Sequence, residues 1–143
     1  MKRHPSQNED QLVAQLSQIE DALEKLTLVQ DRVRKMPPLP AEHRHESNRI
    51  HACATKVWLF SEYRDGICRF QVDSESSIVR GLASLIAEVF SDTPAAAAAE
   101  FESKIIERLG LTRMITPTRL NGLSKLEETI RAFARSSKLT QAP

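Results

Sequence analysis

The sequence predicts an α+β fold in which a small antiparallel sheet is flanked by helices. Apolar residues recur at steps of three and four before residue 37 and again after residue 76, which indicates amphipathic helices. Between these two regions, strand-like runs flank Asp65-Gly66, a dipeptide typical of a tight hairpin turn. Helix, hairpin and further helices in this order favour α+β over alternating βαβ units.

Length, charge and hydrophobicity restrict the possible function classes. The 143 residues suit one domain, expected to span 1–143, and 41% hydrophobic residues supply a single core. A net charge of +1 argues against a broad nucleic-acid-binding surface. No apolar run approaches the ~20 residues of a membrane span. The start, Met1 to Pro5, is not followed by an apolar stretch, so we expect no signal peptide and a cytoplasmic protein.

The segment before the first prolines is predicted to be helical. Ser6 to Glu9 has the spacing of a capping box, and residues 1–7 are expected to form a flexible end. One long helix, or two helices with a bend near 26–28, fits the apolar stripe, which consists of Leu12, Leu16, Ile19, Leu23, Leu26, Val29, Val33 and Met36. Pro37-Pro38-Leu39-Pro40 ends this region because proline lacks an amide proton.

A polar loop and a hairpin are predicted next. Residues 43–48 have no helical period, which indicates a loop, with a short strand at 46–50 as one option. A two-residue turn at 65–66 sets the pairing from Arg64–Ile67 out to Trp58–Asp73. Glu62 then lies opposite Arg69, a pair worth under about 1 kcal/mol. The core face carries Val57, Leu59, Tyr63, Cys68, Phe70 and Val72, and the other face carries Trp58 and Phe60, for which inner packing and partner docking both stay open.

The region after the hairpin is expected to be helical. Asp73-Ser74 supplies a cap for a helix over 78–90, in which Gly81 indicates close packing. Thr93-Pro94 starts another helix, with proline at its first position. The inner face of that helix consists of Phe101, Ile105, Ile106 and Leu109, and Gly110 is its expected C-cap.

A final helix is predicted to begin at Thr116-Pro117, which repeats the pairing of a capping residue with proline. Its amphipathic stripe consists of Leu120, Leu123, Leu126, Ile130 and Phe133. Residues 136–143 are polar and are expected to form a flexible tail.

Cys53 is the strongest candidate for chemistry, because it lies in a loop before the first strand. A thiolate is the reactive form of cysteine, and a loop tip lets it reach a partner. His51 and Lys56 favour the thiolate electrostatically whereas burial disfavours it, so a reactive thiol and a small buried hydrophobe both fit. Cys68 alternates in phase with core residues, which favours core packing over a disulfide with Cys53.

A metal site is not favoured, although His43, His45, His51 and Cys53 fall within eleven residues. Zinc accepts imidazole and thiolate ligands, but structural sites show tighter paired spacings, so exposed loop histidines are the preferred interpretation. The sequence also contains no Gly-rich phosphate loop, nucleophile elbow or H-E-x-x-H helix. The remaining cationic candidates are interpreted as solvated helix residues able to contact an anionic partner: Arg80, Arg113 and Arg119.

Four segments of the chain stand out together, in order and in register. They are Met36-Pro37-Pro38-Leu39-Pro40; Asn48-x-Ile50-x-x-Cys53-x-x-x-Val57-Trp58; Asp73-Ser74 followed by Ile78-Val79-Arg80-Gly81-Leu82; and Leu109-Gly110-Leu111 with Thr116-Pro117-Thr118-Arg119-x-Asn121-Gly122-Leu123. Together they resemble the SufE family, the sulfur acceptors of cysteine desulfurases, and the resemblance covers about 36–133. Ala52 and Thr55 stand where the family commonly has glycine and serine, and both replacements are conservative.

The resemblance implies a SufE/IscU-like fold and a sulfur-transfer function. Cys53 would accept a persulfide from a pyridoxal-phosphate cysteine desulfurase of the SufS or CsdA type and pass the sulfur to a SufB-type scaffold complex for iron–sulfur cluster assembly. His51, Asp73 and Arg119 would bind the partner or support the loop. The chain would be a sulfur-transfer partner with a catalytic cysteine rather than a stand-alone enzyme. It would hold no cofactor or metal, since pyridoxal phosphate stays on the desulfurase, and would bind neither nucleic acid nor membrane.

Two other functions stay open at this point. A CsdE-like paralogue feeding another sulfur pathway has the same residues. A non-catalytic IscU-like scaffold or interaction module is less favoured, because a cluster needs about three cysteine ligands and this chain has two cysteines.

Overall fold

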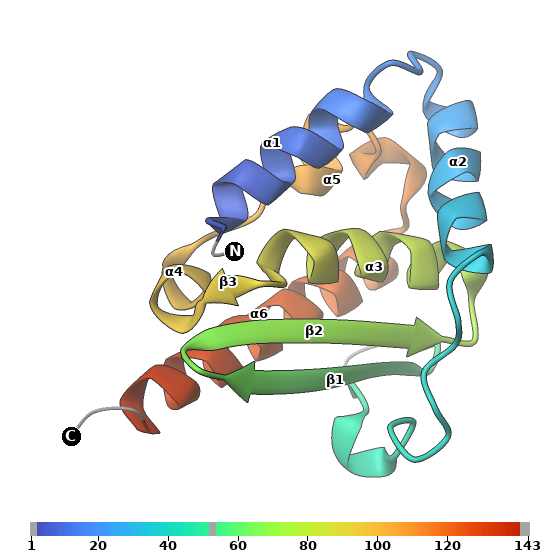
Figure 1. Cartoon of the computed structure of the whole chain (residues 1–143). Helices are drawn as coiled ribbons and strands as arrows, with labels where there is room; N and C mark the ends of the chain where they lie inside the picture. The colour runs from blue at the N-terminus through green and yellow to red at the C-terminus, as the bar shows by residue number, and fades with distance from the viewer. Residues whose placement is uncertain (1–2, 52–53, 141–143) are drawn as a thin grey trace.

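The computed structural model describes residues 3–51 and 54–140, and within them it has the predicted α+β architecture. Three antiparallel strands form one sheet in the order β1-β2-β3, with helices packed around it (Figure 1). The elements in chain order are α1 Pro5–Leu16, α2 Ala22–Arg34, the 3₁₀ turn η1 Glu46–Asn48, β1 Val57–Arg64, β2 Ile67–Ser74, α3 Ser77–Phe90, β3 Thr93–Pro94, α4 Ala95–Glu100, α5 Ile105–Arg108, the 3₁₀ turn η2 Thr112–Met114 and α6 Pro117–Thr140.

The β1–β2 hairpin has the predicted register over its whole length. Asp65 and Gly66 adopt φ angles of 52° and 84°, the left-handed conformation that a two-residue hairpin turn requires. The predicted core face is confirmed, because its residues on both strands are buried or partly buried. Glu62 lies opposite Arg69 as predicted, but the hydrogen bond of the Arg69 guanidinium is to Asp92, at 2.9 Å, just before β3.

Helix α3 lies at the centre of the molecule and packs against α1, α2, α6 and β2 (Figure 1). The predicted close packing at Gly81 is confirmed, because a Cβ atom there would lie 3.0 Å from Cγ1 of Val29 in α2. The predicted cap at Asp73-Ser74 is wrong. Those residues end β2, and the Oγ of Ser76 accepts the Val79 N–H that caps the helix, at 3.3 Å.

The N-terminal region forms two helices, separated at residues 17–21 rather than near 26–28. Ser6 to Glu9 is not the capping box. His4 is the N-cap, and its backbone N–H donates to the side-chain oxygen of Gln7 at 2.9 Å. Helix α1 therefore begins at Pro5, inside the segment that the sequence predicts to be flexible.

The helix predicted to continue from Thr93-Pro94 to Leu109 is interrupted between α4 and α5. At the interruption, the Glu9 carboxylate accepts hydrogen bonds from the Ser103 hydroxyl at 2.6 Å and the Lys104 N–H at 2.9 Å. Glu127 accepts the Ser103 N–H at 3.1 Å. These acceptors replace the carbonyl partners that a continuous helix would supply. Gly110 follows α5 with a φ of 71°, as a C-cap glycine does.

The start of α6 agrees with the prediction, since it begins at Pro117 and the Thr116 hydroxyl oxygen accepts the Arg119 N–H at 3.3 Å. Its end differs, because the helix continues to Thr140, past Ser136 where a polar tail is predicted. No helix in the described part of the chain combines the length and apolar character needed to cross a membrane.

Candidate functional site

The candidate nucleophile Cys53 lies outside the described residues, so the site is built from the residues on either side of it. The Ile50 N–H donates to the Val57 carbonyl at 2.8 Å, and both side chains are buried. Residues 50 and 57, on either side of Cys53 in the sequence, are therefore held together. The optional strand at 46–50 is instead the turn η1, followed by a single bridge between Arg49 and Trp58.

A second set of hydrogen bonds fixes the C-terminal end of this segment. The Lys56 carbonyl accepts the Ser74 hydroxyl at 2.8 Å and the Glu75 N–H at 3.3 Å. The Oγ of Ser74 also accepts the Ser76 N–H at 3.2 Å. This contact of Ser74 is not apparent from the sequence, because its partner is a backbone carbonyl 18 residues away, just outside β1.

Asp73 lies beside this contact and is 6% exposed. Its carboxylate accepts the Leu39 N–H at 3.2 Å and the Ser74 N–H at 2.8 Å. The Nε of Arg80 lies 3.3 Å from Oδ1 of Asp73, an ion-pair distance at which the N–H is not aligned for a hydrogen bond. Arg80 also donates to the Met36 carbonyl at 3.3 Å. These contacts hold the proline-rich segment 36–40 against the sheet. The described contacts of Asp73 are therefore structural.

Arg119 lies on the first turn of α6 and lines a pocket with Ala54 and Thr55, the two residues that follow Cys53. The pocket has a volume of about 350 Å³, and the described residues around it are Ala54, Thr55, Val79, Thr116, Thr118 and Arg119. None of these is acidic. A guanidinium and threonine hydroxyls are hydrogen-bond donors for anions, so the pocket is suited to a negatively charged group.

His51 lies apart from this lining and is exposed, with its Nε2 3.6 Å from a carboxylate oxygen of Glu46. The structure therefore brings one of the three predicted supporting residues, Arg119, to the residues that follow Cys53. Asp73 reaches the same segment through its neighbour Ser74. The predicted effect of His51 on the Cys53 thiolate stays a prediction, because Cys53 lies outside the described residues.

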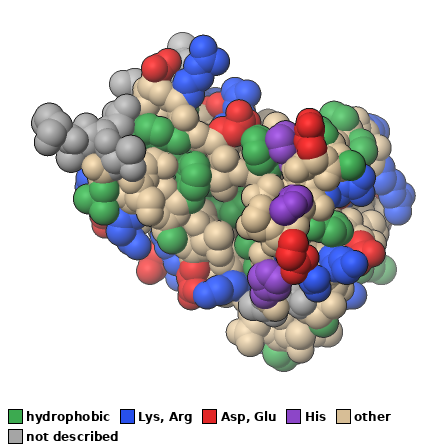
Figure 2. Space-filling model, turned by 90° about the horizontal axis from the view of Figure 1, so that it is seen from below, with side chains coloured by type: hydrophobic (Ala, Val, Ile, Leu, Met, Phe, Trp, Pro, Cys, Tyr) green, Lys and Arg blue, Asp and Glu red, His purple; other side chains and the backbone are tan. Residues whose placement is uncertain are grey.

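The other loop histidines have contacts of their own, and Figure 2 shows histidine side chains gathered among acidic and basic ones on the lower face. The ring of His43 stacks on Phe60 with centroids 3.7 Å apart, and the Nδ1 of His45 accepts the Ser47 N–H at 3.3 Å. The stacking gives Phe60 a packing role. Within residues 3–51 and 54–140, no group of three or more His, Cys, Asp or Glu side chains is arranged to hold a metal ion.

Cys68 is a free thiol that is fully buried in the core cluster, which confirms its predicted packing role. Burial raises the pKa of this thiol to about 11, because the charged form is poorly solvated there. At neutral pH Cys68 is therefore protonated and shielded. It has neither the thiolate character nor the access that a nucleophile needs.

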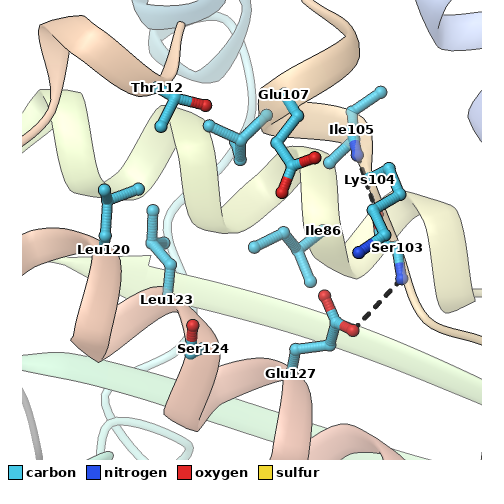
Figure 3. Close-up of a pocket in the computed structure, with 11 residues that line it drawn as sticks. Ile86, Ser103, Lys104, Ile105, Glu107, Thr112, Leu120, Leu123, Ser124 and Glu127 are labelled. Atoms are coloured by element: carbon cyan, nitrogen blue, oxygen red, sulfur yellow. Dashed lines mark hydrogen bonds between the residues drawn. The ribbon is translucent and has the colours of Figure 1, made fainter.

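A second pocket, of about 250 Å³, lies between α3, the segment around α5, and α6 (Figure 3). Of the predicted site residues that the structure describes, His51, Asp73 and Arg119, none lines it. The carboxylates of Glu107 and Glu127 extend into it from opposite walls. Burial raises the pKa of Glu127, although the Ser103 N–H and the charge of Arg131 both oppose that shift. Among the described residues, this pocket and the pocket beside Ala54 and Thr55 share no lining residue.

The raised pKa of Glu127 predicts how its contribution to stability depends on pH. Folding favours the protonated form, so the contribution is fully present below the ordinary pKa of 4.5 and is lost as pH rises through the higher folded-state pKa. We expect the wild-type stability, measured relative to Glu127→Gln, to be greater at pH 5 than at pH 7. Urea unfolding of both proteins at the two pH values measures this difference, and an opposite sign would contradict the assignment.

Comparisons with known proteins identify the family. The family model described as SufE, Fe-S metabolism associated domain, matches residues 10–134, a wider range than the predicted 36–133. An uncharacterized SufE-like protein of Rhizobium etli is 28% identical over 131 residues, covering 88% of each chain. The cysteine desulfuration protein SufE of Wigglesworthia glossinidia brevipalpis is 30% identical over 125 residues, covering 86% of this chain and 87% of that one.

The fold is also found among solved structures. The solution structure of a hypothetical protein from Thermus thermophilus superposes with a TM-score of 0.75 at 22% identity, covering 97% of this chain and 99% of the other. The shared fold and the match over residues 10–134 agree with the four resembling segments. The chain belongs to the SufE family.

Proposed function

We propose that this protein works in cysteine desulfuration, accepting on Cys53 a sulfur atom from a pyridoxal-phosphate cysteine desulfurase. The observation that carries the proposal is the state of the two cysteines in a SufE-family chain. Cys68 is buried with a raised pKa, which leaves Cys53 as the thiol available for exchange. The relative named for cysteine desulfuration supports the same reaction class.

The proposed step is a thiol–persulfide exchange. The Cys53 thiolate attacks the outer sulfur of a cysteine persulfide on the desulfurase, a new S–S bond forms, and the desulfurase cysteine leaves as a thiolate. The exchange needs no external oxidant or reductant, since one S–S bond replaces another. The product is a Cys53 persulfide, and its anion can be balanced by the Arg119 guanidinium in the neighbouring pocket. This chain needs no resident cofactor for the step.

The sulfur then passes, in our proposal, to a SufB-type scaffold complex for iron–sulfur cluster assembly in the cytoplasm. The description of the matching family as an Fe-S metabolism domain supports this destination. The burial of Cys68 argues against a cluster scaffold, because a cluster needs about three accessible cysteine ligands. A CsdE-like role has the same chemistry, and pull-down against SufS-type and CsdA-type desulfurases distinguishes the two.

Intact-mass spectrometry tests the proposal directly. After incubation with a SufS-type or CsdA-type desulfurase and L-cysteine, the protein is expected to gain the mass of one sulfur atom. Peptide mapping is expected to place that sulfur on Cys53, with Cys68 unmodified, because Cys68 is buried and protonated. The control omits L-cysteine. The proposal fails if both folded desulfurases turn over and no adduct forms on Cys53.

A further inference from the structure

We propose that the outer edge of β2, the edge that faces away from β1, binds a short, extended and uncharged peptide segment of a partner protein opposite Val72. The binding site is a pocket of about 300 Å³ between the proline-rich segment 36–40, β2 and α3. This interaction goes beyond the proposed function, and it uses neither cysteine. The evidence is a set of unpaired hydrogen-bonding groups that meet in this pocket.

The hairpin register decides which backbone groups of β2 point away from β1. Arg64 and Ile67 flank the two-residue turn as a hydrogen-bonded pair, and bonded and non-bonded pairs alternate along an antiparallel ladder. Cys68, Phe70 and Val72 therefore turn their N–H and C=O groups toward the outer edge. Strand β3 covers only one end of that edge, where it pairs with Ile67 and Cys68 (Figure 1).

Val72 is left with its outward backbone groups unpaired. The Cys68 carbonyl accepts the Asp92 N–H at 2.8 Å. The Phe70 N–H donates to the Ser91 hydroxyl oxygen at 2.9 Å, and that hydroxyl donates to the Phe70 carbonyl at 3.0 Å. In the described part of the chain, no hydrogen bond reaches the outward N–H or C=O of Val72, although this residue is only 9% exposed. Such groups are nearly always paired in proteins, so a partner that supplies both a donor and an acceptor fits here.

A second unpaired group faces the same pocket from α3. Ser84 is 5% exposed and lines the pocket, and its hydroxyl has no hydrogen-bond partner among the described residues. Ser84 and Ala87 are both small, so they leave space beside Val72 that longer side chains would fill. A residue paired with Val72 places its side chain on the same face of the sheet, over these two positions. The Ser84 hydroxyl is then within the part of the pocket that this side chain enters.

The charges around the pocket indicate an uncharged ligand. The Nε of Arg80 lies 3.3 Å from a carboxylate oxygen of Asp73, and Glu88 lies 2.8 Å from the Arg32 guanidinium. Each charged side chain of the described lining therefore already has a partner of opposite sign. A bound ion would find no free counter-charge, whereas a peptide backbone supplies hydrogen bonds without charge.

An extended peptide matches these groups. Strand addition to an open sheet edge pairs N–H with C=O on both chains, and a side-chain pocket beside the edge gives selectivity. Water can occupy the same groups, so a ligand that displaces it must carry both a donor and an acceptor. The positions on either side are already covered, by Ser91 at Phe70 and by the Leu39 N–H at the Asp73 carboxylate. Room is left for about one paired residue, which is why the segment is short.

The experiment adds a capped tripeptide, acetyl-alanyl-valyl-alanine N-methylamide, to the isotope-labelled full chain. A second probe has an ester in place of the amide that carries the valine N–H, so it lacks the donor that the Val72 carbonyl needs. Binding is followed by the amide resonance and the hydrogen exchange of Val72. Ser84→Leu fills the pocket beside Val72. Ser124→Leu is the matched control, because Ser124 lines the other pocket, between α3, α5 and α6.

We expect the peptide to shift the Val72 amide resonance and, at saturation, to slow its hydrogen exchange at least about fivefold, because the N–H gains an acceptor. The ester is expected to bind about five- to a hundredfold more weakly, since it leaves the Val72 carbonyl unpaired. Ser84→Leu is expected to weaken the peptide at least as much, and Ser124→Leu to bind it within about twofold of wild type.

Three results would overturn the proposal: a Val72 resonance that does not move, an ester that binds as tightly as the peptide, or equal binding of the peptide by Ser84→Leu and Ser124→Leu. The comparison of peptide with ester uses the wild-type chain, so it decides the matter even if Ser84→Leu does not fold. None of these measurements involves sulfur transfer, so their failure and the failure of the proposed function are distinguishable.

Discussion

Cys53→Ser is expected to abolish the stimulation of a cysteine desulfurase, so that sulfide release falls to the rate of the desulfurase alone. A serine hydroxyl is not ionised near neutral pH and cannot form a persulfide, so no sulfur is carried away from the desulfurase. The measurement is sulfide release from L-cysteine with a reductant, with and without each form of this protein. Stimulation by Cys53→Ser equal to that of wild type would end the acceptor hypothesis.

Cys68→Ser provides the matched control for that experiment. Serine in this fully buried position places a hydroxyl among apolar side chains, which is expected to reduce the free energy of unfolding by about 1–3 kcal/mol. Stimulation is expected to persist at a temperature where the variant stays folded, because the thiol of Cys68 is shielded and its pKa is raised. Loss of stimulation by the folded Cys68→Ser protein would contradict its packing role.

Glu9→Gln is expected to lower the free energy of unfolding by about 2–3 kcal/mol, because it leaves buried donors without their charged acceptor. The Glu9 side chain is buried, and its two oxygens accept hydrogen bonds from Ser103, Lys104 and Arg108. A glutamine of the same shape replaces one of these acceptor oxygens with an NH₂ group. Urea unfolding at neutral pH measures the change.

Asp10→Asn is the control, because Asp10 contacts the same guanidinium of Arg108, at 2.8 Å, from an exposed position. Exposed ion pairs contribute little, so the loss is expected to stay below about 1 kcal/mol. If Glu9→Gln and Asp10→Asn had the same free energy of unfolding, the buried carboxylate would not be what stabilises the break between α4 and α5.

The hairpin could be predicted from the sequence to the residue, because its determinants are local. Asp65-Gly66 sets the turn, and the two-residue period of the strands then fixes every pair out to Trp58 and Asp73. The same holds for the start of α6, where Thr116 and Pro117 are adjacent to the helix that they begin.

The features that the sequence did not predict depend on partners far away in the chain. The interruption between α4 and α5 is held by Glu9, 94 residues from Ser103, and the helix propensity of the alanines alone favours continuing. The spacing of Ser6 and Glu9 wrongly predicts a capping box. The residues that Glu9 bonds lie far away in the sequence, so the local spacing gives no sign of them. Arg69 likewise bonds Asp92, whose position depends on how α3 returns to the sheet.

The candidate site likewise combines residues that the sequence indicates with a contact that it does not. Cys53 was predicted from its place in a loop before the first strand, and Asp73 and Arg119 from the resemblance to the SufE family; the roles of all three stay predictions. The contact of Ser74 with Lys56 joins two segments across the hairpin and carries no sequence signal of its own.

The acceptors around Ser103 also constrain how a newly made chain can acquire this structure. Glu9 belongs to α1 and Glu127 to α6, so the hydrogen bonds around Ser103 are complete only when both helices have packed against the middle of the chain. We therefore expect the segment between α4 and α5 to stay incompletely docked until both helices are in place.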